Sequence, residues 1–214
     1  MCMYNYFKRI LDIVLSSIAL VFLFPYLVLV AVIVKAESEG PVLFKQKRVG
    51  KNKKEFYIYK FRTMKTTAPS DIPTHKLIKA ENYITKVGKV LRKSSLDELP
   101  QLINIIKGEM SIVGPRPALW NQFDLVEERD KYGANDILPG LTGWAQVNGR
   151  DELPTEIKAR LDGEYAANIS LLMDIKVILM TVFNVFTAKG IVEGNANNHN
   201  VNEIEVEAHQ HAAI

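Results

Sequence analysis

Cysteine is almost absent from this chain, since Cys2 is the only one in 214 residues. An internal disulfide framework is therefore excluded, and a reducing compartment fits. Histidine is scarce where a site would need it, because three of the four lie beyond position 198. The sequence also lacks a Walker A loop, a dinucleotide fingerprint and cysteine-based zinc spacing, which removes those binding motifs from consideration.

The length suggests one domain, or one domain with an appendage, and 48% hydrophobic content is enough for a real core. The net charge of +3 decides little, but the charges are unevenly placed. Residues 45–65 contain nine Lys or Arg and a single acid, Glu55. Such a basic segment favours an anionic partner, and membrane phospholipid, nucleotide phosphate and nucleic acid all meet that condition.

One long apolar run occupies residues 10–34. At about 1.5 Å per residue, a helix of this length can cross a bilayer core of about 30 Å. Lys8 and Arg9 precede the run and Lys35 follows it, so each end favours the cytoplasmic side. A re-entrant helix satisfies both ends. Pro25 cannot donate a helical hydrogen bond, which predicts a kink between pieces of roughly 15 and 9 residues.

Two other interpretations of this run remain at this point. A single spanning anchor is compatible with the composition, because proline is tolerated in spanning helices. A signal peptide is disfavoured, because the run is too long and contains Asp12 as well as Pro25.

Two adjacent acids, Asp97 and Glu98, precede an apolar repeat at helical spacing. We expect a helix that ends near residue 107, with Gly108 just past its end. Pro100 lacks an amide proton, so we place the start at Asp97, where the first amides have no partners anyway. Residues 110–113 are expected to form a short strand. The two prolines beside Arg116 then predict a stiff turn that holds one guanidinium.

Acids before a helix are common for a simpler reason, because they complement the helix dipole. The chain contains its own comparison, since the tetrapeptide of residues 97–100 recurs at residues 151–154. No second apolar helix and no Pro-Arg-Pro turn follow that copy. The tetrapeptide alone is therefore weak support for an acid pair with an anion clamp.

Residues 56–63 are rich in aromatic residues and predict a strand, which follows an earlier strand within residues 40–50 and a basic turn. Lys60 and Arg62 share one face of that strand and could grip a diphosphate, although two solvated side chains would look the same. Residues 65–80 contain two prolines and are expected to form an exposed loop, a candidate for a mobile lid.

Polar and aromatic side chains alternate with small ones within residues 139–150. Trp144, Gln146, Asn148 and Arg150 would then line one strand face, suited to a sugar or a base, or would mark an exposed edge strand. Residues 119–131 predict an amphipathic surface helix. Residues 171–187 predict a helix in the core or in the membrane interface. The tail from residue 194 has a composition typical of disorder.

Four segments together resemble the bacterial sugar transferases, the monotopic phosphoglycosyl transferases. They are Lys60-Phe61-Arg62-Thr63-Met64, residues 95–102, residues 108–117 and residues 140–150. The resemblance covers about residues 4–192 and is closest to the small members that begin capsule, exopolysaccharide or glycan assembly. No further N-terminal membrane domain of the larger members is expected. In the family the re-entrant helix breaks at a Ser-Pro pair, and here the pair is Phe24-Pro25.

The resemblance implies transfer of a sugar 1-phosphate from a UDP-sugar to undecaprenyl phosphate with magnesium, releasing UMP. It assigns catalysis to Asp97 and Glu98, with Asp97 as nucleophile and metal ligand, and leaves Asp151 and Glu152 as bystanders. An N-acetylated amino sugar is preferred. The expected location is the cytoplasmic face of the bacterial plasma membrane, with membrane contacts at Lys8, Arg9 and Pro25. The candidate substrate-binding residues are Lys60, Arg62, Arg92, Arg116, Pro117, Gln146, Asn148 and Arg150.

The expected architecture is α+β, a mostly helical membrane-associated domain with short strands and interfacial amphipathic helices. Residues 1–36 would form the re-entrant helix, residues 37–192 the catalytic domain, and residues 193–214 a disordered tail. Nucleic acid is not expected as a partner, and a homo-oligomer is compatible with the sequence. A glycosyltransferase that acts on a lipid-linked sugar and releases UDP is the rival activity, and a membrane adaptor is the non-enzymatic alternative.

Overall fold

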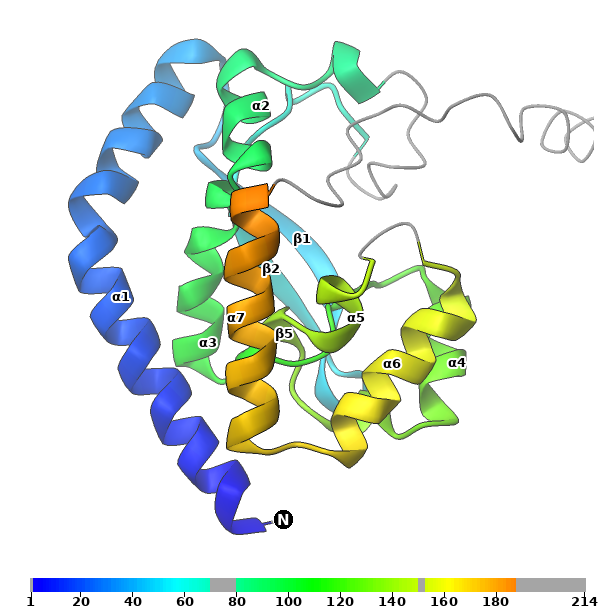
Figure 1. The fold of residues 1–214 in the computed structure, drawn as a ribbon. Helices are drawn as coiled ribbons and strands as arrows, with labels where there is room; N and C mark the ends of the chain where they lie inside the picture. Colours follow the sequence, from blue (N-terminus) through cyan, green and yellow to red (C-terminus); the bar gives the residue numbers. More distant parts are fainter. Residues whose placement is uncertain (1, 70–79, 150–152, 188–214) are drawn as a thin grey trace, which may run out of the picture.

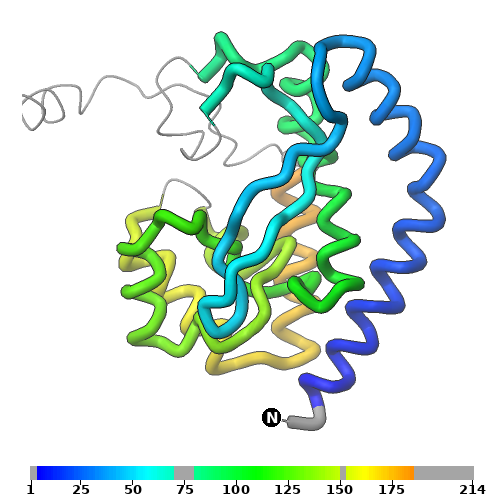
Figure 2. Tube along the Cα trace, turned by 180° about the vertical axis from the view of Figure 1, so that it is seen from behind, coloured from blue at the N-terminus to red at the C-terminus, as the bar shows by residue number. Residues whose placement is uncertain are grey.

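A computed structural model describes residues 2–69, 80–149 and 153–187. The architecture combines helices with two small sheets, as the α+β expectation required. One long helix, α1, runs along one side of the molecule, and α4 and α6 lie on the opposite side with the sheets between them (Figure 1). Seen from behind, α3 lies between α1 and α7 (Figure 2), as it does in Figure 1. The predicted tail lies outside the described residues.

Helix α1 (Cys2–Glu37) is continuous for 36 residues and contains Pro25. The predicted division into two pieces is therefore wrong. A proline removes one hydrogen bond and bends a helix without having to end it, and α1 is bowed along its length (Figure 1). It is long and apolar enough to cross a membrane, and only 11% of its apolar 18-residue stretch is buried inside the protein. Most of its apolar surface therefore faces outward.

Both ends of α1 are fixed to the rest of the protein. Near its start, Arg9 donates to the carbonyls of Ile105 (2.7 Å) and Ile106 (3.1 Å) at the end of α3. At its end, the Glu37 carboxylate accepts a hydrogen bond of 3.0 Å from the Val87 amide in the first turn of α2. These contacts hold the two ends of α1 against one and the same domain.

Lys8 also has an internal partner. Its Nζ lies 2.6 Å from an oxygen of Asp174, whose carboxylate further accepts hydrogen bonds from the hydroxyls of Tyr4 and Tyr165. Farther along α1, the buried Asp12 accepts hydrogen bonds from the Ser111 hydroxyl (2.7 Å) and from a β3 amide. The cations that precede the apolar run thus stabilise the tertiary structure, in addition to any role as membrane flanks.

The larger sheet is built on the predicted strand, basic turn and strand. Strands β1 (Leu43–Val49) and β2 (Glu55–Phe61) pair antiparallel around the short helix η1 (Lys51–Lys53). Strand β4 (Ala118–Leu119) joins the other edge of β1, giving the order β2-β1-β4. A second sheet pairs β3 (Ser111–Val113) with β5 (Gly140–Thr142) in parallel.

The remaining elements are helices of 3 to 17 residues. Their bounds are η3 Ala80–Asn82, α2 Lys86–Lys93, η4 Leu96–Gln101, α3 Leu102–Lys107, α4 Phe123–Asp130, η5 Ala134–Asp136, α5 Trp144–Val147, α6 Thr155–Ala167 and α7 Leu171–Thr187. The surface helix expected at residues 119–131 is present as α4, but it begins only at Phe123, because Leu119 belongs to strand β4. The apolar helix expected at residues 171–187 is confirmed as α7. Residues 70–79 of the predicted exposed loop lie outside the described residues.

Candidate active site

The acid pair lies in the 3₁₀ helix η4, between α2 and α3. Ser95 precedes it in the left-handed region (φ 56°), which turns the chain sharply after α2. The α-helix itself begins only at Leu102, later than the start expected at Asp97. The residues before it, Leu96–Gln101, form the 3₁₀ helix that contains Pro100.

Asn104 fixes this segment against the sheet. The side chain is fully buried, and its Nδ2 donates to the Tyr57 carbonyl (2.8 Å) and to Glu109 (2.7 Å). Its Oδ1 accepts from the Tyr59 amide at 3.1 Å. Strand β2 and helix α3 are thereby locked in register, and this register places Lys60 opposite the acid pair. The sequence analysis attributed no role to Asn104.

Glu98 is held by two cations. Lys60 Nζ lies 2.7 Å from its Oε1, and Arg116 donates to both carboxylate oxygens, at 3.0 Å and 3.4 Å. Burial alone would raise the pKa of Glu98, but the charges and hydrogen bonds of Arg116 and Lys60 outweigh it and lower that pKa. Burial also lowers the pKa of Lys60. Glu98 therefore stays ionised and fixes the positions of both cations.

The pKa of Asp97 is shifted in the opposite direction, upward. Burial and the neighbouring charge of Glu98 raise the pKa of Asp97 to about 6, although Lys60, Arg92 and Arg116 act against that rise. Its side chain lines a cavity of about 970 Å³. At neutral pH Asp97 is thus an ionised but poorly solvated carboxylate facing a space large enough for a ligand, which is a suitable state for a nucleophile.

The other two predicted cations of this region, Arg92 and Arg62, have different partners. Arg92 lines the cavity and donates from Nε to the Thr63 hydroxyl at 2.9 Å. Arg62 also borders the cavity, but its guanidinium donates to the carbonyls of Ser38 (2.6 Å) and Glu39 (2.6 Å), just after α1. The structure therefore commits Arg62 to the end of α1, rather than pairing it with Lys60 across one diphosphate.

The Pro-Arg-Pro turn is held from two sides by arginines that the sequence analysis did not identify. Arg129 donates to the Arg116 carbonyl (3.0 Å) and forms a buried ion pair with Asp162. Arg48 donates to the carbonyl of Pro117, whose buried ring lines the cavity, at 2.9 Å. No local pattern could have revealed these contacts, since Arg129 and Asp162 are 33 residues apart.

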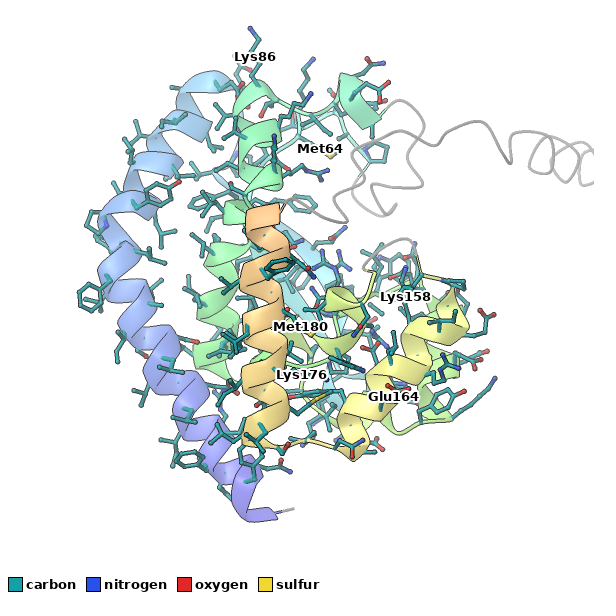
Figure 3. All side chains as sticks on the ribbon, viewed as in Figure 1. Met64, Lys86, Lys158, Glu164, Lys176 and Met180 are labelled. Carbon is teal, nitrogen blue, oxygen red and sulfur yellow. The ribbon has the colours of Figure 1, made fainter. Side chains whose placement is uncertain are left out.

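The strand expected within residues 139–150 is wrong beyond Thr142. Residues Trp144–Val147 form the one-turn helix α5, closed by a hydrogen bond of 3.1 Å from the Val147 amide to the Gly143 carbonyl. Four alternating residues are too few to separate a strand from a helical turn. The indole Nε1 of Trp144 donates a hydrogen bond of 3.1 Å to Glu164 of α6, and Nζ of Lys176 of α7 lies 4.6 Å from the ring centroid. Figure 3 shows Glu164 and Lys176 on neighbouring helices.

Because Trp144–Val147 form a helical turn, the polar residues of this segment do not share one face as they would in a strand. Gln146 lines the cavity and donates to the Leu141 carbonyl at 3.3 Å, while its buried Oε1 has no hydrogen-bond partner among the described residues. Asn148 is exposed and donates to the Trp144 carbonyl. Arg150 lies outside the described residues, as do Asp151 and Glu152 of the repeated tetrapeptide. Of these polar candidates, Gln146 is the one that reaches the cavity.

A metal ion would need ligands beyond the protein. Within residues 2–69, 80–149 and 153–187, no group of three or more His, Cys, Asp or Glu side chains is placed to hold one. In the acid pair, Glu98 is committed to Lys60 and Arg116, which leaves Asp97 as a carboxylate ligand. That is compatible with magnesium, which is commonly held by one or two carboxylates together with substrate phosphates and water.

Residues 3–188 match the sequence profile of the family described as bacterial sugar transferase. The chain belongs to this family. The assignment made from its motifs is therefore confirmed. "Uncharacterized sugar transferase EpsL" of Bacillus subtilis is 38% identical over 188 residues, which are 88% of this chain and 91% of that protein.

Two longer relatives have names that state a reaction. "UDP-glucose:undecaprenyl-phosphate glucose-1-phosphate transferase" of Xanthomonas campestris is 41% identical over 86% of this chain and 40% of its own length. "UDP-N-acetylgalactosamine-undecaprenyl-phosphate N-acetylgalactosaminephosphotransferase" of Aeromonas hydrophila is 40% identical over 87% of this chain and 45% of its own length. This bacterial sugar transferase thus spans less than half of either relative. Their names support an enzyme of the phosphoglycosyl transferase type.

Proposed function

We propose that this chain transfers a sugar 1-phosphate from a UDP-sugar to a polyprenyl phosphate such as undecaprenyl phosphate, releasing UMP, as a first step of exopolysaccharide or related glycan assembly. The observation that carries the proposal is the asymmetric acid pair. Asp97 faces the cavity with a raised pKa, while Glu98 is paired with Lys60 and Arg116. One carboxylate is thus available for attack, and the other keeps two cations beside it.

The reaction is proposed to proceed in two displacements. An Asp97 oxygen attacks the β-phosphorus of the UDP-sugar, the bond from that phosphorus to the bridging oxygen breaks, and UMP leaves with the electron pair. A phosphate oxygen of the lipid then attacks the same phosphorus, which releases Asp97 and forms polyprenyl diphosphate sugar. Arg116, Lys60 and Arg92 lie where they can offset the charge that develops on the leaving phosphate.

Magnesium belongs to the proposal as a cofactor, with Asp97 as its protein ligand. When bound beside a diphosphate, it would supply electrostatic stabilisation of the phosphate oxygens.

The membrane arrangement follows from the two ends of α1. Both are attached to one domain, through Arg9 and Lys8 at the start and through Glu37 and Arg62 at the end. We therefore favour α1 as a helix that enters and leaves the bilayer on one side, the cytoplasmic face, over a helix that spans it. Sticks in Figure 3 project outward along the whole length of α1, and the large side chains among them are mostly apolar.

Mass spectrometry of the purified enzyme tests the mechanism. UDP-sugar alone should release UMP in an amount equal to the enzyme and leave the sugar phosphate on Asp97. Asp97→Asn should abolish both signals, because an amide is a poor nucleophile. Asp151→Asn is the matched control, since the same tetrapeptide surrounds it, and should retain both. If UMP forms only when the lipid is present and no adduct is found, direct attack by the lipid phosphate replaces this mechanism.

The identity of the products separates the remaining alternatives. Release of UDP instead of UMP would indicate a glycosyltransferase acting on a lipid-linked sugar. For the sugar we propose an N-acetylated amino sugar, on the resemblance to capsule-type members, and the assay compares UDP-N-acetylgalactosamine with UDP-glucose. A higher kcat/KM for UDP-glucose would correct the sugar without affecting the proposed reaction.

A further inference from the structure

Helix α7 has an apolar face that no described part of the chain covers. Its exposed residues recur three or four positions apart and therefore lie along one side of the helix. They are Leu171, Leu172, Ile175, Ile178, Leu179, Val182 and Phe183. Leu172, for instance, is 81% exposed. An apolar stripe of this size on a protein surface marks an interaction site rather than ordinary exposure.

The start of α7 is anchored to the start of α1. The Asp174 carboxylate accepts hydrogen bonds from Tyr4 (2.8 Å) and Lys8 (2.6 Å) of α1. α3 lies between the two helices in both views, and its Ile103 is also exposed (Figures 1 and 2). The apolar stripe of α7 therefore adjoins the outward apolar surface of α1, which the proposed function places in the membrane.

Two residues belong both to this stripe and to the wall of the active-site cavity. Ile178 is 36% exposed and Val182 is 49% exposed, and each also lines the cavity that contains Asp97. They lie one turn apart, so they form a continuous edge. The cavity thus reaches the apolar stripe at this edge of α7.

The cavity wall combines apolar and charged side chains. Ile112, Leu141 and Leu99 line it together with Ile178 and Val182. The same lining includes Asp97 and the cations Lys60, Arg92 and Arg116. A ligand that matches this combination of surfaces has an anionic head and a long apolar tail.

We propose that Ile178 and Val182 form the entry through which the prenyl chain of the acceptor passes from the bilayer to the active site. The first isoprene units would pack on these two side chains while the phosphate reaches Asp97. This inference rests on the proposed function, because it takes the polyprenyl phosphate from there. Ordinary phospholipid would also cover the outer stripe, but its bulky headgroup, unlike a bare phosphate, does not match the cationic end of the cavity.

Photocrosslinking provides a direct test of occupancy. A benzophenone amino acid replaces Val182 in one protein and Leu172 in another, and each is placed in phosphatidylglycerol vesicles that contain undecaprenyl phosphate. The position 182 probe should yield adducts with undecaprenyl phosphate well above its share of the lipid. The position 172 probe, on the same stripe but away from the cavity, should yield lipids in their bulk ratio. Equal bulk ratios at both positions would overturn the proposal.

Kinetics provide the second test, with Val182→Asn and Ile178→Asn compared with Leu179→Asn. Leu179 lies on the outer stripe and does not line the cavity. Each of the first two variants should raise the KM for undecaprenyl phosphate about tenfold, the equivalent of about 1.4 kcal/mol in binding. The KM for the UDP-sugar should stay unchanged, and Leu179→Asn should resemble the wild type. Equal effects of all three substitutions would assign the face to general membrane binding.

Different results would contradict the proposed function and the proposed prenyl entry. If the wild type transfers no sugar phosphate to the lipid, the proposed function is wrong, whatever α7 contacts. If the wild type is active but the position 182 probe captures lipids in their bulk ratio and substitutions at 178 and 182 leave the acceptor KM unchanged, the prenyl entry is wrong and the reaction stands.

Discussion

Adjacent carboxylates at positions 97 and 98 have opposite titration behaviour because their partners differ. Glu98 accepts hydrogen bonds from Lys60 and Arg116, which lower its pKa despite burial. Asp97 has no comparable ion pair with the residues that the structure describes, and burial raises its pKa to about 6. The difference that we propose between a nucleophile, Asp97, and a positioning group, Glu98, arises at the level of single side chains.

The rate of UMP release should depend on pH through Asp97. Only the ionised carboxylate can attack phosphorus, so the single-turnover rate should fall about tenfold for each unit that the pH drops below about 6. Quenched-flow measurement between pH 5 and 8 would record it, and the Asp151→Asn protein should show the same profile. A rate that stays constant down to pH 5 would contradict the raised pKa or the role of Asp97.

The pH dependence of stability should run opposite to that of the rate of UMP release. Because the pKa of Asp97 is raised above 3.8 on folding, the native state binds the extra proton between these values, and the free energy of unfolding falls as pH rises through that window. At pH 7 the buried charge therefore costs stability, by up to about 3 kcal/mol. Asp97→Asn should raise the melting temperature at pH 7 and have little effect near pH 4. A lower melting temperature at pH 7 would show that the carboxylate stabilises the fold.

Arg116→Lys should reduce activity while the protein remains folded. A lysine keeps the charge but can reach only one oxygen of Glu98 and loses the planar fork. Loss of one charge-assisted hydrogen bond, about 1.5 to 3 kcal/mol, corresponds to a fall in kcat/KM of about 10- to 100-fold. Arg160→Lys, at an exposed position on α6, is the matched control and should keep wild-type activity. Near-normal turnover of Arg116→Lys would assign Arg116 to a structural role.

At the scale of elements, the site depends on how β2, η4 and α3 are held together. Lys60 comes from β2, Glu98 from η4 and Arg116 from the turn after β3, and they meet at one carboxylate. The buried side chain of Asn104 joins α3 to β2 through two hydrogen bonds with the backbone of β2. Precise placement of the cations is thus a consequence of element packing.

Asn104→Ala should lower stability and activity together. The Tyr57 carbonyl and the Tyr59 amide would lose their partner in a buried region, at a cost of about 2 to 3 kcal/mol in the free energy of unfolding. Thermal unfolding in detergent would measure the loss. Asn82→Ala, at an exposed position, should change stability by less than about 0.5 kcal/mol. Equal melting temperatures for the two variants would show that Asn104 does not couple α3 to β2.

At the scale of the whole molecule, α1 is part of the domain as well as its proposed membrane element. Asp12, near the start of the apolar run, is buried against β3, so its carboxylate does not lie on the outward surface of α1. With both ends of the helix attached to the same domain, a spanning arrangement would require these contacts to break. The geometry therefore favours one-sided insertion.

Labelling of intact cells with a membrane-impermeant maleimide tests this topology. Cys2 is the natural reporter for the start of α1, and Lys51→Cys in a Cys2→Ser background reports the residues beyond its end. Both should be protected in intact cells and react after permeabilisation, which serves as the control for accessibility. Reaction of Cys2 in intact cells while position 51 stays protected would establish a spanning helix.

The sequence by itself determined the family, the β1–β2 pair, the apolar helices and the residues of the acid pair. Each of these signals is local, because it depends on residue types a few positions apart. The same locality produced the errors. A four-residue alternation predicted a strand where α5 forms, and Pro25 predicted a kink between two pieces where one continuous helix is bowed.

Only the tertiary structure decided which charged side chains serve the site. Lys60 and Arg62 have the same sequence signal, yet one reaches Glu98 and the other is bound to carbonyls just after α1. Arg129 and Asp162 support the Arg116 turn from positions that no pattern connects. The reason is physical: the partner of a buried charge is chosen by packing between segments far apart in the chain, and the sequence does not encode that packing in any short repeat.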